Sequence, residues 1–171
     1  MLIMRHYTRV PAATTGQVEP PKPGIRDPHL NQLSWNDSDP GPCIDVVVLN
    51  SREVIEAGRT VGLEYPEPIK MKALLDTGAA VTVISKTFAK YCKLLQTGET
   101  EIRALGSLHK CGEYAGAISF PGTNLRPYDP IRIVSADFVQ EQHYAILIGR
   151  DILRNWTITF DGRSKRVTIA D

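Results

Sequence analysis

The fold of this chain is decided by the stretch ALLDTGAAVTVIS, residues 73–85. An acid, a hydroxyl residue and a glycine stand here between two apolar runs, and each run is typical of a buried β-strand. A carboxylate at the end of a buried strand is costly unless it is hydrogen-bonded, shares a proton or faces solvent in a cleft. The position of Asp76 therefore requires an explanation.

The two residues after Asp76 can hold its carboxyl group in one place. Thr77 offers a hydroxyl, and Gly78 permits close backbone approaches that a Cβ would prevent. The other interpretation is a plain tight turn, because Asp and Gly are common turn residues. Three residues alone do not decide between the two.

Length and charge narrow the classes of protein to consider. A chain of 171 residues is long enough for one domain with a core and too short for two lobes of ordinary size. Lys and Arg total 20 against 19 acidic residues, so the charge gives no indication of a nucleic-acid or membrane partner. The sequence has no long apolar run, which predicts a cytoplasmic protein without a signal peptide or membrane span.

The cysteines and histidines do not indicate metal or disulfide chemistry. The three cysteines are odd in number and widely spaced, which argues for free thiols in a reducing compartment. Only His109 and Cys111 lie close together, and two candidate ligands are a weak metal signal. We predict no metal and no cofactor.

Residues 1–42 differ in composition from the rest, because they hold seven of the twelve prolines and few aliphatic residues. This composition favours an extended or partly disordered arm, from which Trp35 could dock on the domain. The arm is either a plain disordered tail, or a pro-segment or linker of a longer precursor that the protein cuts itself.

Residues 43–171 are predicted to form one all-β domain with one or two short helices. The predicted strands are residues 44–49, 69–75, 81–84, 131–134, 145–148, 156–160 and 166–169. Ser85 is the predicted N-cap of a helix over residues 86–93, and a further short helix is predicted over residues 150–155. For residues 51–62, a helix and an irregular segment both remain open.

A ribbon punctuated by Gly106, Gly112 and Gly116 occupies residues 101–120. A mobile hairpin and an ordinary hairpin with bulges both fit this pattern. Elsewhere the chain repeats one arrangement, a buried strand that ends in a glycine turn before a short helix, once at Asp76 and once at Gly149.

Two motifs together resemble a known family. The segments LLDTGA at 74–79 and ILIGRDIL at 146–153 are similar to the paired motifs of the retropepsins, the single-lobed aspartic proteases of retroviruses and their cellular and bacterial relatives. Their order and approximate separation also match. The resemblance covers residues 43–171 and implies a closed β-barrel or sandwich with a flap hairpin, which works as a homodimer.

The resemblance also implies roles for single residues. Asp76 would be the catalytic acid, Thr77 would form a hydroxyl hydrogen bond across the dimer axis, and Gly78 would exchange backbone hydrogen bonds with substrate. The other residues that it assigns are substrate contacts in the cleft and flap, and supports beneath the active loop: Ala79, Ala80, Leu105, Gly106 and Ser107, and then Gly149 and Arg150.

Ala80 departs from the family pattern. Many viral members have an acid at this position, which contacts the substrate backbone and pairs with the arginine of the second motif. Because this chain has Ala80 instead, Arg150 lacks that partner and we expect it to bind elsewhere.

Peptide hydrolysis by acids needs two carboxyl groups that share one proton, one to activate water and one to donate to the carbonyl oxygen. The triplet DTG occurs once, so the prediction is a symmetric homodimer with Asp76 from each copy and an acidic optimum. Terminal strands can pair between subunits, and an extended peptide or protein substrate would lie in the cleft like an added strand.

Two other functions are consistent with the sequence. A non-catalytic interaction module could keep the retropepsin fold and bind through its cleft or dimer face, although the intact DTG triplet argues against it. A small β-barrel that binds a small molecule would explain Asp76 as a turn residue but would leave the second motif unexplained.

Overall fold

The computed structural model describes residues 30–36, 39, 41–104, 106–137 and 144–171. The strands of this part are β1 (Leu30–Ser34), β2 (Cys43–Asn50), β3 (Lys70–Leu75), β4 (Val83–Ser85), β5 (Gln96–Ala104), β6 (Ser107–Ser119), β7 (Tyr128–Ala136), β8 (Ile146–Ile148), β9 (Thr157–Asp161) and β10 (Arg166–Ala170). The helices are α1 (Arg52–Thr60), α2 (Lys86–Tyr91) and α3 (Arg150–Leu153).

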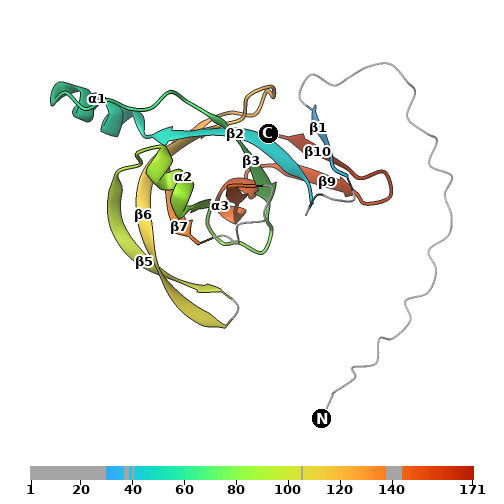
Figure 1. Ribbon diagram of the computed structural model, residues 1–171. Coiled ribbons are helices and arrows are strands. Elements are labelled where there is room, and N and C mark those ends of the chain that lie inside the picture. The colour runs from blue at the N-terminus through green and yellow to red at the C-terminus, as the bar shows by residue number, and fades with distance from the viewer. Residues whose placement is uncertain (1–29, 37–38, 40, 105, 138–143) are drawn as a thin grey trace, which may run out of the picture.

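Seven strands form a sheet that closes on itself. Their order is β2-β3-β8-β4-β7-β6-β5, and β2 also pairs with β6, so six strands make a ring and β5 lies outside it on β6. Closure satisfies the backbone groups that an open sheet would leave unpaired at its edges. The prediction of an all-β, closed-barrel fold is confirmed (Figure 1).

The barrel core follows from period-two alternation in the strands. Along β3, Met71, Ala73 and Leu75 are buried while Lys70 and Lys72 are exposed, as the sequence predicts. Burial along β2 alternates in the same way. The largest side chains that are almost fully buried are aliphatic and β-branched: Ile44, Ile84, Ile118, Ile133, Ile146, Ile148, Ile152, Ile169, Val46, Val48, Val134 and Val167.

A second sheet, in the order β1-β10-β9, packs beside the barrel (Figure 1). Its strand β1 lies within the segment for which the sequence predicts an extended arm and no strand. The register pairs Leu30 with Ala170 and Ser34 with Arg166, and Leu33 packs against the core. The strand has only two apolar residues, so its local pattern is weak, and the pairing depends on β10. The pro-segment hypothesis concerns residues 1–42, of which residues 1–29, 37, 38 and 40 lie outside the described residues, and it stays a prediction.

Two of the three helices begin at a serine cap. The Ser85 hydroxyl accepts the N–H of Phe88 at 3.2 Å, as predicted for α2, and the Ser51 hydroxyl accepts the N–H of Val54 at 3.4 Å. Helix α1 occupies the range that the sequence left open between helix and irregular segment. The sequence predicts one or two short helices, at the positions of α2 and α3, and the described residues contain α1 as a third helix.

The hairpin of β5 and β6 projects from the barrel, away from α1 (Figure 1). Its register shifts between Gln96 and Gly98, which marks a bulge, and Gly106 takes a positive φ of 83° beside its turn. The structure thus contains the predicted hairpin together with one of the predicted irregularities.

Candidate active site

The end of β3 fixes the Asp76 carboxyl group with backbone hydrogen bonds. The Asp76 N–H donates to the carbonyl of Ile148 at 3.0 Å, which ties the loop to β8. Oδ1 of Asp76 then accepts the N–H of Gly78 at 2.8 Å. A Cβ on residue 78 would lie 3.0 Å from that same oxygen, so glycine permits this close approach.

Gly149 packs directly under the active loop. A Cβ on this residue would overlap the carbonyl group of Val81 and come within 2.9 Å of the backbone nitrogen of Thr82. Because backbone atoms have no rotamers with which to yield, only glycine fits here. The second glycine turn therefore lies against the chain that leaves the Asp76 loop.

Thr82 and Asp151 join the two motifs through side chains that the sequence analysis did not single out. Asp151 accepts the N–H of Thr82 with Oδ2 and the Thr82 hydroxyl with Oδ1, both at 2.9 Å. The Thr82 hydroxyl in turn accepts the N–H of Gly149 at 3.3 Å. The only sequence signal for this network is that Asp151 stands directly after Gly-Arg in the second motif.

Arg150 binds the carbonyl groups of the active loop. Its Nη1 donates to the carbonyl oxygens of Thr77 at 2.8 Å and Gly78 at 3.4 Å, and its backbone N–H donates to Ala79 at 2.9 Å. With Ala80 at the next position, the guanidinium group has no acid there to pair with. These carbonyl contacts are where Arg150 binds instead. The side chain of Thr77 is exposed, and its role across a dimer axis stays a prediction.

A cleft of about 800 Å³ opens beside Asp76 and lies between the active loop and β5. Its lining is largely small and apolar near the loop and charged at its margins. The lining residues are Asp76, Gly78, Ala79, Ala80, Val81, Val83, Thr100, Glu101, Ile102, Arg103, Arg132, Ala136, Asp137 and Leu147. Strand β8 was predicted to be buried on both faces, but Leu147 is only half-buried because it faces this cleft.

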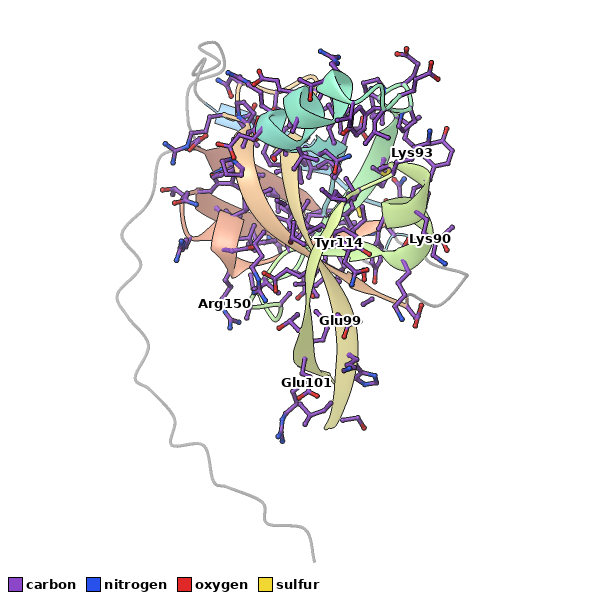
Figure 2. All side chains as sticks on the ribbon, turned by 90° about the vertical axis from the view of Figure 1, so that its left-hand side faces the viewer. Lys90, Lys93, Glu99, Glu101, Tyr114 and Arg150 are labelled. Carbon is purple, nitrogen blue, oxygen red and sulfur yellow. The ribbon has the colours of Figure 1, made fainter. Side chains whose placement is uncertain are left out.

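The cleft wall comes from the second half of β5, and Figure 2 shows Glu101 on the projecting part of the hairpin. Of the three predicted flap contacts, Gly106 and Ser107 lie near the tip and are exposed. They are not among the residues that line the cleft in this single chain. Leu105 lies outside the described residues. The sequence placed the flap contact on these tip residues, whereas Thr100 to Arg103 form the wall.

Two ion pairs hold charged residues at the cleft margins. Arg132 donates to Glu113 at 2.8 Å, and this hydrogen bond lowers the pKa of Glu113 and raises the pKa of Arg132. Lys86 pairs with Asp137 at 2.7 Å, which raises the pKa of Lys86. These three shifts each favour the charged form of the side chain.

Tyr144 is a further neighbour of the active loop that the sequence analysis missed. Burial and, secondly, the negative charge of Asp76 raise the pKa of its hydroxyl group. The residue stands two positions before the first residue of β8, where the second motif begins.

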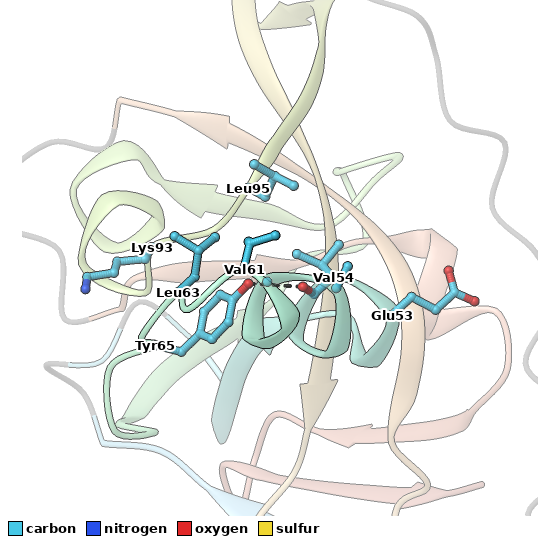
Figure 3. Close-up of a pocket in the computed structure, with 9 residues that line it drawn as sticks. Glu53, Val54, Val61, Leu63, Tyr65, Lys93 and Leu95 are labelled. Carbon is cyan, nitrogen blue, oxygen red and sulfur yellow. Dashed lines mark hydrogen bonds between the residues drawn. The ribbon is translucent and has the colours of Figure 1, made fainter.

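A separate apolar pocket of about 430 Å³ lies under α1 (Figure 3). Val61 and Leu63 remain 74% and 57% exposed there, and the Tyr65 hydroxyl donates to the carbonyl of Val54 at 3.0 Å. None of the catalytic residues named above lines this pocket. It therefore has no direct part in the chemistry at Asp76.

The described residues contain neither a candidate metal-binding cluster nor a helix that could span a membrane. Among them, no group of three or more His, Cys, Asp or Glu side chains is arranged to hold a metal ion. No helix in the described ranges has the length and apolarity needed to cross a membrane.

Comparison with solved structures finds distant similarities. No family model matches the chain, and a search of curated proteins gives no significant match. The chain is similar to a retropepsin-like aspartic protease from Rickettsia conorii, with 15% identity over 82% of this chain and 89% of that one, at a TM-score of 0.48.

Two further solved structures are similar to the chain at comparably low identity. The EIAV protease is 20% identical over 71% of this chain and 92% of its own, at a TM-score of 0.45. The retroviral protease-like domain of Ddi1 from Leishmania major is 16% identical over 70% and 82%, at a TM-score of 0.37. The retropepsin-like resemblance of the sequence thus recurs as a distant similarity of fold, from which nothing follows about activity.

Proposed function

We propose that this chain is an aspartic endopeptidase, which acts as a homodimer and hydrolyses peptide bonds between the Asp76 carboxyl groups of two subunits. The observation that carries the proposal is the position of Asp76. Its Oδ1 accepts the N–H of Gly78 at 2.8 Å, and the residue lines a cleft of about 800 Å³.

The chemistry needs a second carboxyl group close to the first. Two carboxyls at hydrogen-bonding range cannot both ionise, so one stays a carboxylate and takes a proton from water. The other stays protonated and donates to the substrate carbonyl oxygen as the water attacks. The described chain holds a single Asp-Thr-Gly loop, and a second subunit supplies the matching acid.

The remaining groups orient the acid and the substrate. The N–H of Gly78 orients the Asp76 carboxyl group, and the Asp76 backbone N–H, which donates to Ile148, holds the loop, so little reorganisation is needed during the reaction. An extended peptide fits between the loop and the wall formed by β5, where it can use its backbone hydrogen bonds as an added strand does. Arg150 acts on the loop and contributes only by positioning it.

The direct experiment is cleavage of an unfolded protein substrate at acidic to neutral pH. We expect Asp76→Asn to reduce the cleavage rate at least about 100-fold, which is the scale of acid-base catalysis. Glu56→Gln is the control, since it neutralises an exposed carboxylate on α1, outside the cleft, and should leave the rate unchanged. Equal rates for wild type and Asp76→Asn would refute the proposed function.

A further inference from the structure

A small polar pocket lies next to the catalytic cleft and is linked to it by one ion pair. It has a volume of about 250 Å³, and Lys86 on its wall pairs at 2.7 Å with Asp137, which lines the cleft. Three lysines contribute to the pocket, two from α2 and one from β6, against one glutamate. The whole chain carries a formal charge of only +1, so this pocket concentrates positive charge.

The lysines of the pocket are unequally neutralised. Lys86 pairs with Asp137 and Lys110 pairs with Glu99 at 3.3 Å. Lys90 has no ion pair within the described part of the chain. Figure 2 shows Lys90 extending from α2 on the side of the molecule where the hairpin carries Glu99 and Tyr114. One ammonium group at the pocket is therefore left without a counter-charge.

The floor of the pocket presents hydroxyl groups. Ser135 is 1% exposed, and its Oγ accepts the N–H of Gly112 at 3.2 Å. This bond uses the oxygen as an acceptor, so the hydroxyl hydrogen is still available to donate. No acceptor for it is found among the described residues. Tyr114 adds a second hydroxyl at the same pocket.

Gly112 packs closely against both of these hydroxyl groups. A Cβ at this position would stand 2.8 Å from the Tyr114 hydroxyl oxygen and 3.2 Å from the Ser135 hydroxyl oxygen. A methyl group would thus displace the Tyr114 hydroxyl from its present position. The arrangement of the two hydroxyl groups therefore depends on glycine at residue 112.

We propose that this pocket binds a phosphate group, either as inorganic phosphate or as a phosphomonoester. Three ammonium groups and two hydroxyls offer more donors than a carboxylate with two oxygens can use, whereas a tetrahedral phosphate presents three or more acceptor oxygens. The bound dianion supplies the counter-charge that Lys90 lacks and competes with Asp137 for Lys86. This site is independent of the proposed protease activity.

The test is calorimetric titration of the full chain at constant ionic strength with inorganic phosphate, phosphoserine and acetate. Wild type should bind phosphate or phosphoserine saturably at one site and acetate more weakly. Lys90→Gln should weaken phosphate binding at least about tenfold, the effect expected for one hydrogen bond to a charged group. Lys70→Gln is the control, because it removes the same charge from β3, outside the pocket, and should bind as wild type does.

Gly112→Ala gives a second arm, in which the added methyl should also weaken binding; circular dichroism checks that this variant is folded. Tighter binding of phosphoserine than of inorganic phosphate assigns the site to a phosphomonoester, and the reverse order assigns it to free phosphate. The proposal is overturned by the absence of saturable binding of both compounds, by acetate binding as tightly as phosphate, or by unchanged affinity in Lys90→Gln.

Discussion

At the residue scale, the active loop depends on two glycines that allow backbone and carboxylate to approach closely. Gly78 lets its own N–H reach Oδ1 of Asp76, and Gly149 lets the second turn lie against Val81. The contact at Gly78 orients the carboxyl group of Asp76, and the contact at Gly149 lets the second glycine turn pack against the chain that leaves the loop. A substitution at Gly149 therefore tests the packing of the loop without changing the carboxyl group of Asp76.

Gly149→Ala should destabilise the fold by about 1–3 kcal/mol or more, the usual cost of forcing extra atoms into a packed site. The reason is the overlap of the new methyl group with the carbonyl of Val81. Urea unfolding followed by fluorescence of Trp35 and Trp156 measures the change. Gly162→Ala is the control, because nothing lies within 4 Å of a Cβ there. Equal midpoints for the two variants would contradict the packing described for Gly149.

Thr82→Val should cost roughly 1–3 kcal/mol, the penalty for leaving buried hydrogen-bond partners unsatisfied. The side chain is 0% exposed, and its hydroxyl both donates to Asp151 and accepts from Gly149. Valine keeps the shape and removes both bonds. Urea unfolding measures the change in the free energy of unfolding, and Thr60→Val, at the exposed end of α1, is the control. If Thr82→Val lost no more free energy of unfolding than Thr60→Val, the network of Thr82 and Asp151 would contribute nothing to stability.

Single residues differ in how far the sequence could predict them. Asp76 and Gly149 were predictable because each stands in a local motif whose chemistry is unusual for a buried strand end. The bond between Thr82 and Asp151 was not, because its partners are far apart along the chain and meet only through the pairing of β4 with β8. Local patterns carry no information on such a pairing.

At the scale of elements, the β-strands with strong alternation match the sequence predictions, whereas β1 was missed. The buried face of β3 follows from its pattern of apolar residues. Strand β1 has a weak pattern, and its stability comes from β10, where Val167 and Ile169 are fully buried. The position of the cleft wall was also missed, because it depends on how the hairpin bends over the barrel.

Removal of β1 should destabilise the barrel more than the strand's length suggests. A chain that starts at Trp35 should be less stable by roughly 2–5 kcal/mol than one that starts at Leu30, since Leu33 no longer packs against the core and β10 loses one of its two partner strands. Thermal unfolding of the two truncated chains measures the difference. Equal melting temperatures would show that the β1–β10 pairing has no stabilising role.

The antiparallel pair of β2 and β3 gives a pH prediction. A hydrogen bond from Lys72 lowers the pKa of Asp45 below its ordinary value of 3.8. A lowered folded-state pKa stabilises the protein above the unfolded value, and this contribution is lost as the pH falls through the folded value. The Lys72 side chain is 56% exposed and the Asp45 side chain 32%, so solvent screens the pair and the effect should be roughly 0.2–1 kcal/mol.

Asp45→Asn should therefore lose less stability than wild type between about pH 5 and about pH 3, the range in which an ordinary aspartate becomes protonated. Urea unfolding at the two pH values measures both losses. Identical losses in the two proteins would mean that the ion pair with Lys72 does not contribute to folding.

At the scale of the whole molecule, the proposed activity requires two copies of the chain. We predicted that terminal strands pair between subunits, but β10 is already paired on both edges, with β1 and β9. The free edges of this sheet are the outer edges of β1 and β9, within the described residues. Any pairing between subunits through the terminal sheet would use one of these edges.

The central claim is that two Asp76 residues from different subunits form one active site, and subunit mixing tests it most directly. Wild type is equilibrated with a growing molar excess of Asp76→Asn chain, and cleavage of an unfolded protein is measured at constant wild-type concentration. Mixed dimers hold a single Asp76, so the account predicts that activity falls toward zero as the excess grows. Activity that stays at the level of wild type alone, while both chains remain folded and mixed, would contradict a shared site.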